Sequence, residues 1–406
     1  MTNTEWKECT IGDIADVQTG PFGSQLHEKD YVSAGTPIVT VEHLGNRTFS
    51  TQNLPMVSDS DKSRLQKYCM KQGDLIFSRV GSVDRCTYAN ENNEGWLFSG
   101  RCLRVRPQEC VDSMWLYYFF CLESTKTFIR NIAVGATMPS INTKLMCEVP
   151  VKYPPLAEQQ RIAKILSTLD DKIELNNAIN RNLEEQAQAI FKSWFIDFEP
   201  FGGEMPSDWE NGKLSDLGTV VAGGTPSKAR STYYTDNGIA WITPKDLSLH
   251  PNKFTSKGEI DITQEGYDNS SAKIMPKGTV LFSSRAPIGY ISIAQNEICT
   301  NQGFKSLVPK VNVGTPYVYF YLKNHTEEIE NKASGSTFKE ASGSLMNGLE
   351  AIIPSDQILS KFNSLCKPIF EQQESLELEN QRLVLLRDNL LPKLMSGELD
   401  VADARI

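Results

Sequence analysis

Two segments of the chain place apolar residues at alternating steps of four and three, over residues 162–194 and 362–394. Spacing that averages 3.5 residues is typical of helices that pack along a continuous seam, as in a coiled coil. The first pattern predicts one helix over residues 156–198, roughly 64 Å long. In the second, Pro368 removes a backbone donor and crowds the preceding turn, so we expect a kink or a restart there.

Each predicted helix must bury its apolar stripe, and the other helix is the obvious partner. A parallel pair would require the intervening domain to carry the chain back along the whole rod, but a domain of about 150 residues is only roughly 40 Å across. We therefore predict an antiparallel pair whose halves are related by a pseudo-two-fold axis. Asn180 and Asn380 lie near the helix midpoints, and we expect this polar pair to meet across the seam and fix its register. The predicted seam residues are Ile162, Leu166, Leu169, Ile173, Asn180, Leu183, Leu376, Asn380, Leu383 and Leu390.

The segment before each helix has a different pattern, in which short β-rich runs alternate with Gly, Pro, Asn and Ser. Residues 36–41 and 289–294 are such runs, whereas 115–132 and 318–329 have the apolar spacing of helices. Each segment is therefore predicted to fold as a mixed α/β domain.

The whole arrangement occurs twice. Gly20 recurs as Gly223, 203 residues on, and the run at 135–137 recurs at 335–337, 200 residues on. A register that holds over many positions indicates two copies of one unit of about 200 residues, which is too long a period for a solenoid. The predicted fold is mixed α/β, with two similar α/β domains separated by two long antiparallel coiled-coil helices in a pseudo-two-fold repeat. The predicted boundaries are 1–153 and 201–353 for the domains, and 154–200 and 354–406 for the helical spacers.

Composition narrows the class of protein. The chain has 406 residues, with 41 Lys and Arg against 50 Asp and Glu, a net charge of −9. A protein that binds nucleic acid alone is usually basic, so any DNA contact must use local patches or a partner. The longest apolar stretch, Trp115–Leu122, is far shorter than the ~20 residues of a membrane helix, and the N-terminus does not resemble a secretory signal. Nine cysteines without a Cys-x-x-Cys pair indicate reduced thiols, so we expect a cytoplasmic protein.

The sequence contains no motif of a familiar enzyme class. It lacks the phosphate loop, the dinucleotide-binding glycine pattern and the Gly-x-Ser-x-Gly elbow. The four histidines are far apart, which disfavours a metal site or a catalytic triad. Residues 170–172 (Asp-Asp-Lys) resemble a nuclease fragment, but they lie in the predicted helix, where a solvated charged face is the simpler interpretation. We therefore predict no catalytic residue, no metal and no cofactor in this chain.

The domains do offer polar, glycine-rich loops with isolated cations at matching places in the two copies. Backbone amides and hydroxyls in such loops bind phosphates, and Arg and Gln side chains read purine edges in the major groove. Each loop alone is a weak signal, because a glycine loop is first a turn and an exposed Arg is first a solvated charge. A common scaffold with different loop side chains suits two readers of different sequences. The candidate DNA-binding residues are Ser24, Gln25, His43, Arg47, Arg79, Arg85, Arg101, Thr137, Thr225, Lys228, Arg230, Lys245, Arg285, Lys305, Thr337 and Lys339.

Several stretches resemble the specificity subunits of type I restriction–modification systems. Residues 155–166 (Pro-Leu-Ala-Glu-Gln-Gln-Arg-Ile-Ala-Lys-Ile-Leu) resemble the start of the family's first conserved helix, and residues 191–198 resemble its end. Residues 390–399 resemble the end of the second conserved helix. The runs that begin at Trp6 and Trp209 resemble the openings of the family's two target-recognition domains. The resemblance covers nearly the whole chain.

The resemblance implies a non-catalytic subunit that gives an enzyme complex its DNA specificity. Each target-recognition domain would bind one half of a split, asymmetric site on double-stranded DNA, while the helices set the gap and dock two methyltransferase subunits. Endonuclease–translocase subunits would complete the complex, and S-adenosylmethionine, ATP and Mg would be bound by these partner subunits. The chain departs from the family at residues 354–357, where the second helix lacks the Glu-Gln pair of the first. The two ends of the helical unit are therefore expected to hold a partner unequally.

Two other interpretations stay open from the sequence. The chain could be part of a fused restriction–modification enzyme, although no span of about 200 residues is left for a catalytic domain. It could also be a stand-alone scaffold that binds only proteins, which would show no salt-sensitive DNA binding. The recognised DNA sequence cannot be predicted, because base readout depends on loop geometry and DNA shape.

Overall fold

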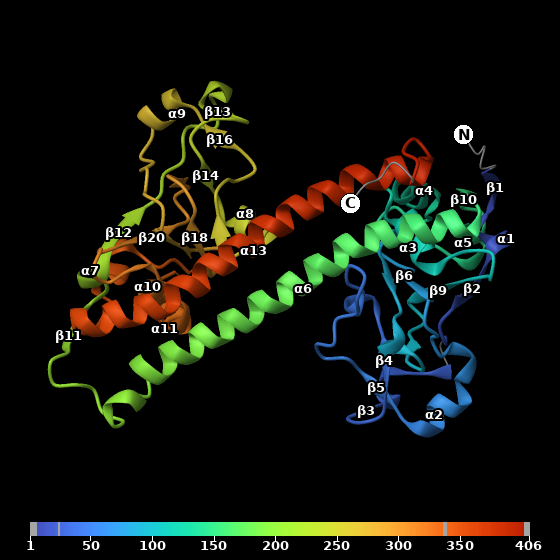
Figure 1. Ribbon diagram of the computed structural model, residues 1–406, viewed down its shortest axis with the longest axis horizontal. Coiled ribbons are helices and arrows are strands. Elements are labelled where there is room, and N and C mark those ends of the chain that lie inside the picture. The colour runs from blue at the N-terminus through green and yellow to red at the C-terminus, as the bar shows by residue number, and fades with distance from the viewer. Residues whose placement is uncertain (1–5, 23–24, 336–338, 402–406) are drawn as a thin grey trace. The chain divides into compact units, whose positions relative to one another are not determined.

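A computed structural model describes residues 6–22, 25–335 and 339–401. The chain divides into two compact units (Figure 1), which we call unit 1 (residues 1–173 and 382–406) and unit 2 (residues 174–381). Two long helices, α6 (Leu156–Phe195) and α13 (Asp356–Ser396), cross the division. Each unit therefore consists of one head and one half of each long helix.

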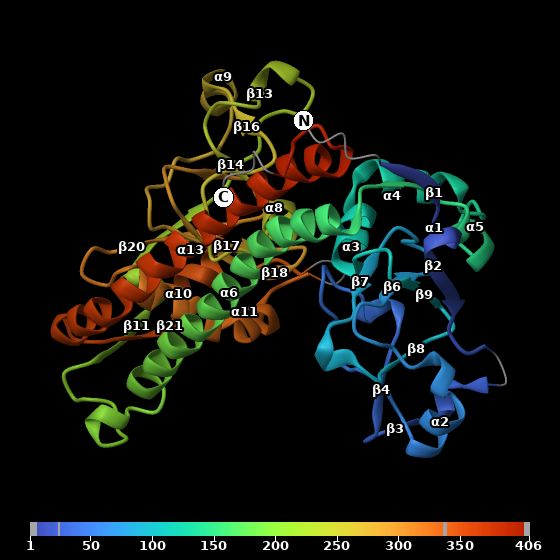
Figure 2. The same ribbon diagram turned by 45° about the vertical axis from the view of Figure 1, so that its right-hand side comes forward.

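The halves of α6 and α13 lie side by side in opposite directions in each unit, as Figures 1 and 2 show. In unit 1, Arg387 Nη1 lies 2.7 Å from Asp170 Oδ1. In unit 2, Asn176 Nδ2 donates to Asn380 Oδ1 at 2.9 Å, and Gln373 Nε2 donates to the backbone oxygen of Asn180 at 3.2 Å. Residue numbers thus fall along α13 as they rise along α6, which confirms the predicted antiparallel pair.

The side-chain hydrogen bonds of Asn380 go to Asn176 and Asn177 rather than to Asn180, the predicted partner. Asn380 Oδ1 accepts from Asn176, and Asn380 Nδ2 donates to Asn177 Oδ1 at 2.8 Å. Asn180 lies one turn after Asn176, so in an antiparallel pair it faces a residue before Asn380, which is Gln373. Equivalent positions in two antiparallel copies meet only at the axis, which these contacts place near residues 178 and 378. Asn180 and Asn380 therefore lie on either side of it.

Two details of the long helices differ from the sequence-based expectation. The first helix ends at Phe195 rather than at Phe198, whose left-handed backbone (φ 53°) belongs to the turn that follows. The expected restart at Pro368 does not occur, because α13 is continuous through this position. Pro368 is exposed, so the carbonyl group that loses its helical partner can bind water instead.

The head of unit 1 is built from three small sheets, with strand orders β2-β9-β6-β7, β3-β5-β4-β8 and β1-β10. The strands are β1 (Lys7–Thr10), β2 (Ala15–Thr19), β3 (Tyr31–Val32), β4 (Thr36–Val39), β5 (Met56–Val57), β6 (Leu75–Ser78), β7 (Cys86–Tyr88), β8 (Leu97–Phe98), β9 (Cys102–Pro107) and β10 (Pro150–Tyr153). The helices are α1 (Ile11–Ile14), α2 (Asp59–Arg64), α3 (Ser113–Cys121), α4 (Glu123–Ile132) and α5 (Thr143–Cys147), with 3-10 turns η2 (Glu28–Asp30), η3 (Val41–His43), η4 (Gln66–Tyr68) and η5 (Glu91–Asn93).

The head of unit 2 repeats this topology. Its strands are β11 (Glu210–Lys213), β12 (Gly218–Ala222), β13 (Tyr234–Thr235), β14 (Trp241–Ile242), β15 (Phe254–Thr255), β16 (Asp261–Ile262), β17 (Val280–Ser284), β18 (Ile288–Ala294), β19 (Cys299–Thr300), β20 (Lys305–Pro309) and β21 (Glu350–Ile353). Its helices are α7 (Leu214–Leu217), α8 (Pro244–Leu249), α9 (Gln264–Asp268), α10 (Thr315–Asn324), α11 (Thr326–Lys332) and α12 (Gly343–Gly348), with 3-10 turns η6 (Glu199–Phe201) and η7 (Ser231–Tyr233). The sheet β12-β20-β17-β18 corresponds to β2-β9-β6-β7, and the parallel pair β14-β19 corresponds to β4-β8.

The sheets of the two heads differ in two ways. In unit 1, β5 pairs with both β3 and β4, whereas in unit 2 the pairs β13-β16 and β14-β19 form separate sheets. In unit 2, β15 joins the main sheet parallel to β18, as a fifth strand beyond the four that both heads share. The shared strands support the prediction of two copies of one mixed α/β unit, and the extra strand shows that the copies have diverged around this common core.

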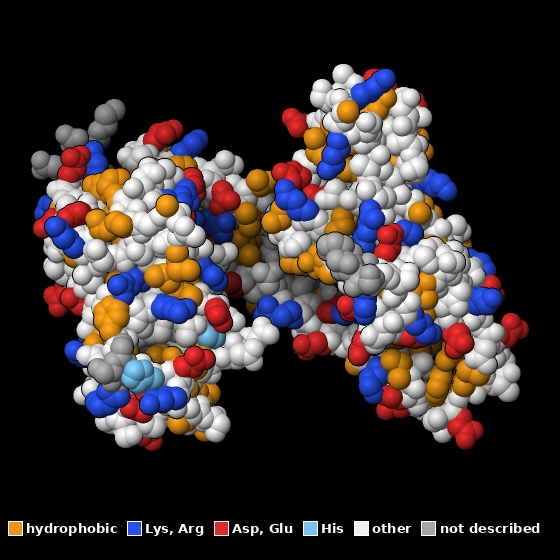
Figure 3. All heavy atoms as spheres, turned by 180° about the vertical axis from the view of Figure 1, so that it is seen from behind, with side chains coloured by type: hydrophobic (Ala, Val, Ile, Leu, Met, Phe, Trp, Pro, Cys, Tyr) orange, Lys and Arg blue, Asp and Glu red, His pale blue; other side chains and the backbone are white. Residues whose placement is uncertain are grey.

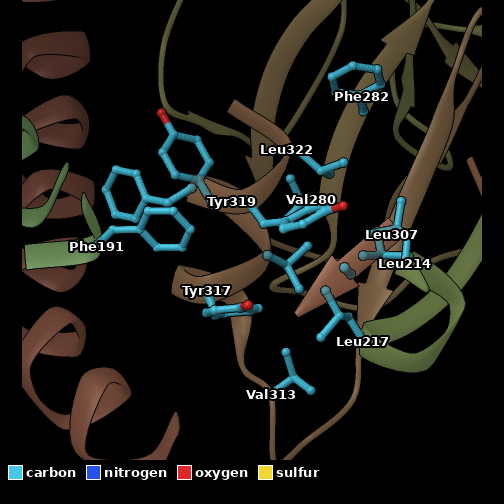
Figure 4. Packing of buried hydrophobic residues seen from close by; sticks show 14 of the residues in the cluster. Phe191, Leu214, Leu217, Val280, Phe282, Leu307, Val313, Tyr317, Tyr319 and Leu322 are labelled. Carbon is cyan, nitrogen blue, oxygen red and sulfur yellow. The ribbon is translucent and has the colours of Figure 1, made fainter. Parts of the chain in front are cut away.

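A single helix of each head packs between the main sheet and the long helices. In unit 1 this is α3, which begins where Asp112 Oδ1 accepts from the backbone nitrogen of Trp115 at 2.9 Å. In unit 2 it is α10, and Figure 4 shows it between Phe191 of α6 and the sheet residues Val280 and Leu307. The apolar side chains of α3 and α10 are almost entirely buried, so the heads are joined to the helices by continuous hydrophobic cores.

The predicted seam residues all lie at least partly out of solvent. Ile162, Leu166 and Leu169 are buried, and Ile173, Asn180, Leu183, Leu376, Asn380, Leu383 and Leu390 are half-buried. Helices over 113–132 and 315–332 confirm the apolar spacing there, as strands β4 and β18 confirm the two β-rich runs. Within the described ranges, no helix is long and apolar enough to cross a membrane.

Candidate nucleic-acid interface

Three loops of unit 1 meet at the end of strand β6. The backbone nitrogen of Arg79 donates to the Arg101 carbonyl at 2.8 Å, and that of Ile141 donates to the Arg79 carbonyl at 3.0 Å. Gly81 donates in turn to the Pro139 carbonyl at 2.8 Å. The backbone therefore gathers the turns after β6 and β8 and the loop 134–140 at one edge of the head, and we call this group the first loop cluster.

Four of the predicted residues in unit 1 lie in the first loop cluster. Arg85, Arg101 and Thr137 are exposed. Arg79 is half-buried, because its guanidinium lies 4.7 Å from the Phe22 ring centroid and its Nη1 donates to the Gly100 carbonyl at 3.3 Å. The cluster thus presents three accessible side chains around one that is already held by the fold.

Three further predictions in unit 1 fall on side chains that bind other residues of the same unit. His43 is buried, and its Nδ1 lies 2.9 Å from Thr40 Oγ1, where it caps η3. Arg47 Nη2 lies 2.5 Å from Asp171 Oδ1 on α6. Gln25 Oε1 accepts from the Tyr68 hydroxyl at 2.8 Å. The structure therefore does not bring His43 and Arg47 to the first loop cluster, and Ser24 lies outside the described residues.

Unit 2 has an open groove at the corresponding edge, with a volume of about 1040 Å³. Four of the predicted residues line it. They come from the turns after β12, β14 and β17 and from the loop that leads into η7. These are Thr225, Lys228, Lys245 and Arg285. Cations, hydroxyls and amides on the walls of an open groove are the groups that bind phosphates and base edges.

The groove walls are fixed by buried hydrogen bonds. Trp241 Nε1 donates to the Gly224 carbonyl at 2.9 Å. The carboxylate of Asp246 accepts from the backbone of Thr243 at 2.7 Å and of Glu259 at 2.8 Å, so it caps α8 and links two loops. Lys245 Nζ pairs with Glu259 Oε2 at 2.6 Å, and this side-chain hydrogen bond raises the pKa of Lys245. Lys245 therefore stays charged at the groove mouth.

Beside the groove, Glu340 lies between Arg285 and Lys305 of β20, and we call these residues and the groove lining the second loop cluster. Glu340 Oε2 lies 3.4 Å from Arg285 Nη1, and Glu340 Oε1 lies 3.4 Å from Lys305 Nζ. Lys339 is exposed next to Glu340. Arg230 instead packs on its own turn, with Nη1 3.2 Å from the Tyr233 hydroxyl. Thr337 lies outside the described residues.

The repeated glycines explain why both heads bring their loops together in the same way. A Cβ atom on Gly20 would collide with the Ser99 carbonyl, and one on Gly223 would collide with the Asn301 carbonyl. Both glycines therefore allow the loop after the first sheet strand to touch the turn after β8 or β19. The glycine that begins the repeated run also has a positive φ in both copies, which is 113° at Gly135 and 125° at Gly335.

Backbone contacts also show which loop positions correspond. Arg79 donates to the Arg101 carbonyl in unit 1, and Ser284 donates to the Gly303 carbonyl at 2.7 Å in unit 2. The two arginines of unit 1 thus occupy positions held by a serine and a glycine in unit 2, whose cations come from adjacent positions. The heads share a backbone scaffold but present different side chains.

The sequence-based search missed three side chains of the second loop cluster. Gln302 is exposed, and its Oε1 accepts from the Thr225 hydroxyl; Asn301 lines the same groove. Glu340 holds two predicted cations. Gln302 could have been found from the repeat, because Asn301-Gln302 follows the strand β19 where Ser99-Gly100 follows β8.

The surface charge is mixed rather than uniformly basic. Figure 3 shows one face of the molecule, on which Lys and Arg side chains alternate with Asp and Glu over both heads. Within the described ranges, no group of three or more His, Cys, Asp or Glu residues could hold a metal ion. Basic side chains therefore form small patches at the loop clusters rather than one extended basic surface, as expected for a chain with a net charge of −9.

Comparisons with known proteins identify this pair of heads. A family model described as the type I restriction modification DNA specificity domain matches residues 3–185 and 206–380. The type I restriction enzyme HindI specificity subunit of Haemophilus influenzae is 26% identical over 98% of this chain and 100% of its own length. The MjaIX specificity subunit of Methanocaldococcus jannaschii is 40% identical over 45% of each chain.

The fold comparison agrees with the sequence comparisons. The crystal structure of a type I restriction–modification S subunit from M. genitalium is similar with a TM-score of 0.64, at 17% sequence identity and over 97% of each chain. The family domain occurs twice and spans most of the chain. The protein therefore belongs to the family of type I restriction–modification DNA specificity subunits.

Proposed function

We propose that this chain selects the DNA sequence on which a type I restriction–modification complex acts, with each head binding one half of a split, asymmetric site on double-stranded DNA. The observation that carries the proposal is the pair of loop clusters, which have the same backbone contacts but different side chains. Arg79 and Arg101 in unit 1 correspond to Ser284 and Gly303 in unit 2. Readers that differ in this way would select different half-sites.

We also propose that α6 and α13 hold the two heads at a fixed spacing and dock two methyltransferase subunits. Support for docking comes from large apolar side chains that the helices leave in solvent. Leu175 is 55% exposed and Leu385 is 64% exposed, although both lie on helices whose seams are otherwise covered. Exposed leucines on a rigid helix are typical of surfaces that bind another protein.

The remaining parts of the proposal concern chemistry that this chain would leave to its partners. We propose that the methyltransferase subunits bind S-adenosylmethionine and methylate adenine, and that endonuclease–translocase subunits bind ATP and Mg. The chain itself would hold no cofactor and would act in the cytoplasm, where its nine free cysteines stay reduced. A scaffold that binds only proteins is the second candidate, and it is disfavoured because it gives no reason for the groove of unit 2 to be lined by cations.

The test is to co-express the chain with the methyltransferase subunit of its own system and to map DNA methylation across the host genome. We expect methylated adenines in one split motif with unlike halves, and none when the methyltransferase is expressed alone. Arg101→Ala should relax only one half of the motif, and Gln302→Ala only the other, because the two side chains lie in different heads. Methylation without a split motif, or relaxation of both halves by either variant, would contradict the proposal.

A further inference from the structure

Glu340 is a carboxylate inside a loop cluster that is otherwise suited to an anion. It lies 3.4 Å from both Arg285 Nη1 and Lys305 Nζ. The Lys305 side chain is only 12% exposed, whereas those of Arg285 and Glu340 are 36% and 40% exposed. A partly exposed carboxylate therefore occupies the place between two cations where a DNA phosphate would otherwise be attracted.

The backbone holds Glu340 in this place. Its nitrogen donates to the Ser334 carbonyl at 2.8 Å, and the next residue, Ala341, donates to the Ser284 carbonyl at 2.9 Å. The end of β17, which precedes Arg285, is thus tied directly to the segment that carries Glu340. Backbone hydrogen bonds on both sides therefore fix the position of the Glu340 carboxylate within the loop cluster.

The first head has no carboxylate at the matching position. The backbone of Ser140 bonds to that of Val134 at 2.8 and 2.9 Å, just as Glu340 bonds to Ser334. Ser140 Oγ donates to the Val134 carbonyl at 3.1 Å. The two heads therefore differ in one charge at this position, which is a difference in how each would meet DNA.

We propose that Glu340 is a specificity-determining residue of the second head, which neutralises Arg285 and Lys305 until a base amino group in the DNA major groove hydrogen-bonds to it. This inference rests on the proposed function. A phosphate that approached the two cations would have to displace Glu340 or lie beside its negative charge, so binding to arbitrary sequence is weakened. A cytosine or adenine amino group is a hydrogen-bond donor, and it compensates the carboxylate while the cations turn to the backbone.

The experiment measures DNA binding by the complex of this chain with its methyltransferase subunits, on duplexes with and without the methylated motif, over a range of salt concentrations. For Glu340→Gln we expect binding to the duplex without the motif to tighten about tenfold, with a salt slope steeper by about one phosphate contact. The preference for the duplex with the motif should fall by about tenfold or more, since the amide both frees the cations and loses the charged acceptor.

Two variants make this result specific to Glu340. Glu328→Gln removes the same charge from α11, where Glu328 pairs with Lys332 at 2.7 Å, and it should change neither affinity nor salt slope. Glu340→Asp keeps the charge and should retain most of the preference. Unchanged binding to the duplex without the motif in Glu340→Gln, or an equal loss on both duplexes, would overturn the inference. A wild-type complex without salt-sensitive DNA binding would overturn the proposed function itself, and this inference with it.

Discussion

The two units join head and helices in the same geometry but with different buried charges. In unit 1, Asp170 on α6 accepts from the Tyr118 hydroxyl at 2.6 Å and pairs with Arg387 on α13 at 2.7 Å. In unit 2, Glu184 on α6 pairs with Lys253 of the head at 2.6 Å. Unit 1 therefore uses its buried ion pair to link the two long helices, whereas unit 2 uses it to fasten the head to α6.

The ion pair of unit 1 has no counterpart at the corresponding positions of unit 2. Phe370 lies 200 residues after Asp170, and Ala187 lies 200 residues before Arg387; both are buried apolar residues in unit 2. The repeat thus kept the hydrophobic shape of each junction while its charges changed. A buried charge is tolerated at a new place on the seam where a neighbour supplies its counter-ion.

Lys253 is the most enclosed charge of the two junctions, with 7% of its side chain exposed. Its Nζ lies 3.4 Å from the centroid of the Phe370 ring and 2.8 Å from Gln373 Oε1. Burial lowers the pKa of Lys253 to about 8, against the opposing effect of Glu184. Burial alone would raise the pKa of Glu184, but Lys253 and Lys323 outweigh it and lower that pKa to about 2.

The largest expected effect comes from breaking the unit 2 pair. Glu184→Gln leaves the Lys253 charge buried without its counter-ion, so it should lower the free energy of unfolding of unit 2 by about 3 kcal/mol. Hydrogen exchange followed by mass spectrometry at increasing urea measures this, because it separates peptides of unit 2 from those of unit 1. Peptides of unit 1 should keep their protection.

The matched control is Glu185→Gln, which removes the same charge from the exposed neighbour on α6 and should have an effect below about 0.5 kcal/mol. The pH dependence gives a second check. Since the folded state lowers the pKa of Glu184, its contribution is complete above pH 4.5 and is lost as the pH falls toward 2. The difference between wild type and Glu184→Gln should shrink over that interval, and a constant difference would argue against a charge effect.

The unit 1 junction should be less sensitive. Asp170→Asn keeps an oxygen that can accept from the Tyr118 hydroxyl, but it removes the charge that faces Arg387. The Arg387 side chain is 27% exposed and also pairs with Asp388 at 2.8 Å, so it is not left alone in the core. We expect a loss of about 1–2 kcal/mol, confined to unit 1, in the same hydrogen-exchange measurement.

The control for unit 1 is Asp171→Asn at the adjacent position. Asp171 is 56% exposed where it meets Arg47, and solvent screening should keep its effect below about 1 kcal/mol. A loss from Asp170→Asn as large as that from Glu184→Gln would remove the distinction between the two junctions.

The long helices could be predicted from sequence because their signal is local and periodic, but their ends could not. The pattern favoured Ile190 and Trp194, whereas Phe191 and Phe195 are the more buried residues there. The reason is a third element: the ring centroid of Tyr317 on α10 lies 5.7 Å from that of Phe191 and 4.8 Å from that of Phe195. A seam that faces two neighbours is wider than a heptad pattern predicts.

The candidate site was harder to predict than the fold. Loop positions followed from the repeat, but the availability of each side chain depends on partners distant in sequence, such as Asp171 for Arg47. Gln159, in the motif that resembles the family helix, is another case. It is buried, accepting from the Asp112 nitrogen at 2.8 Å and donating to the Pro154 carbonyl at 2.8 Å. This part of the motif thus serves the junction of unit 1.

The smallest expected effect lies where α6 and α13 contact each other directly. Asn176 is fully buried; its Nδ2 donates to Asn380 Oδ1 and to Glu379 Oε2 at 2.8 Å, while its own Oδ1 has no partner among the described residues. Asn176→Leu removes that unsatisfied oxygen and leaves Asn380 bonded to Asn177. The relieved oxygen offsets part of the two lost hydrogen bonds, and the half-buried Glu379 carboxylate can bind water instead. The free energy of unfolding of unit 2 should therefore change by less than about 1 kcal/mol, in contrast to either charged junction. The same hydrogen-exchange experiment reads this out, with Asn177→Leu on the exposed side of the pair as its control. A loss near 3 kcal/mol would mean that the polar pair, rather than the ion pairs of the junctions, holds the helices together.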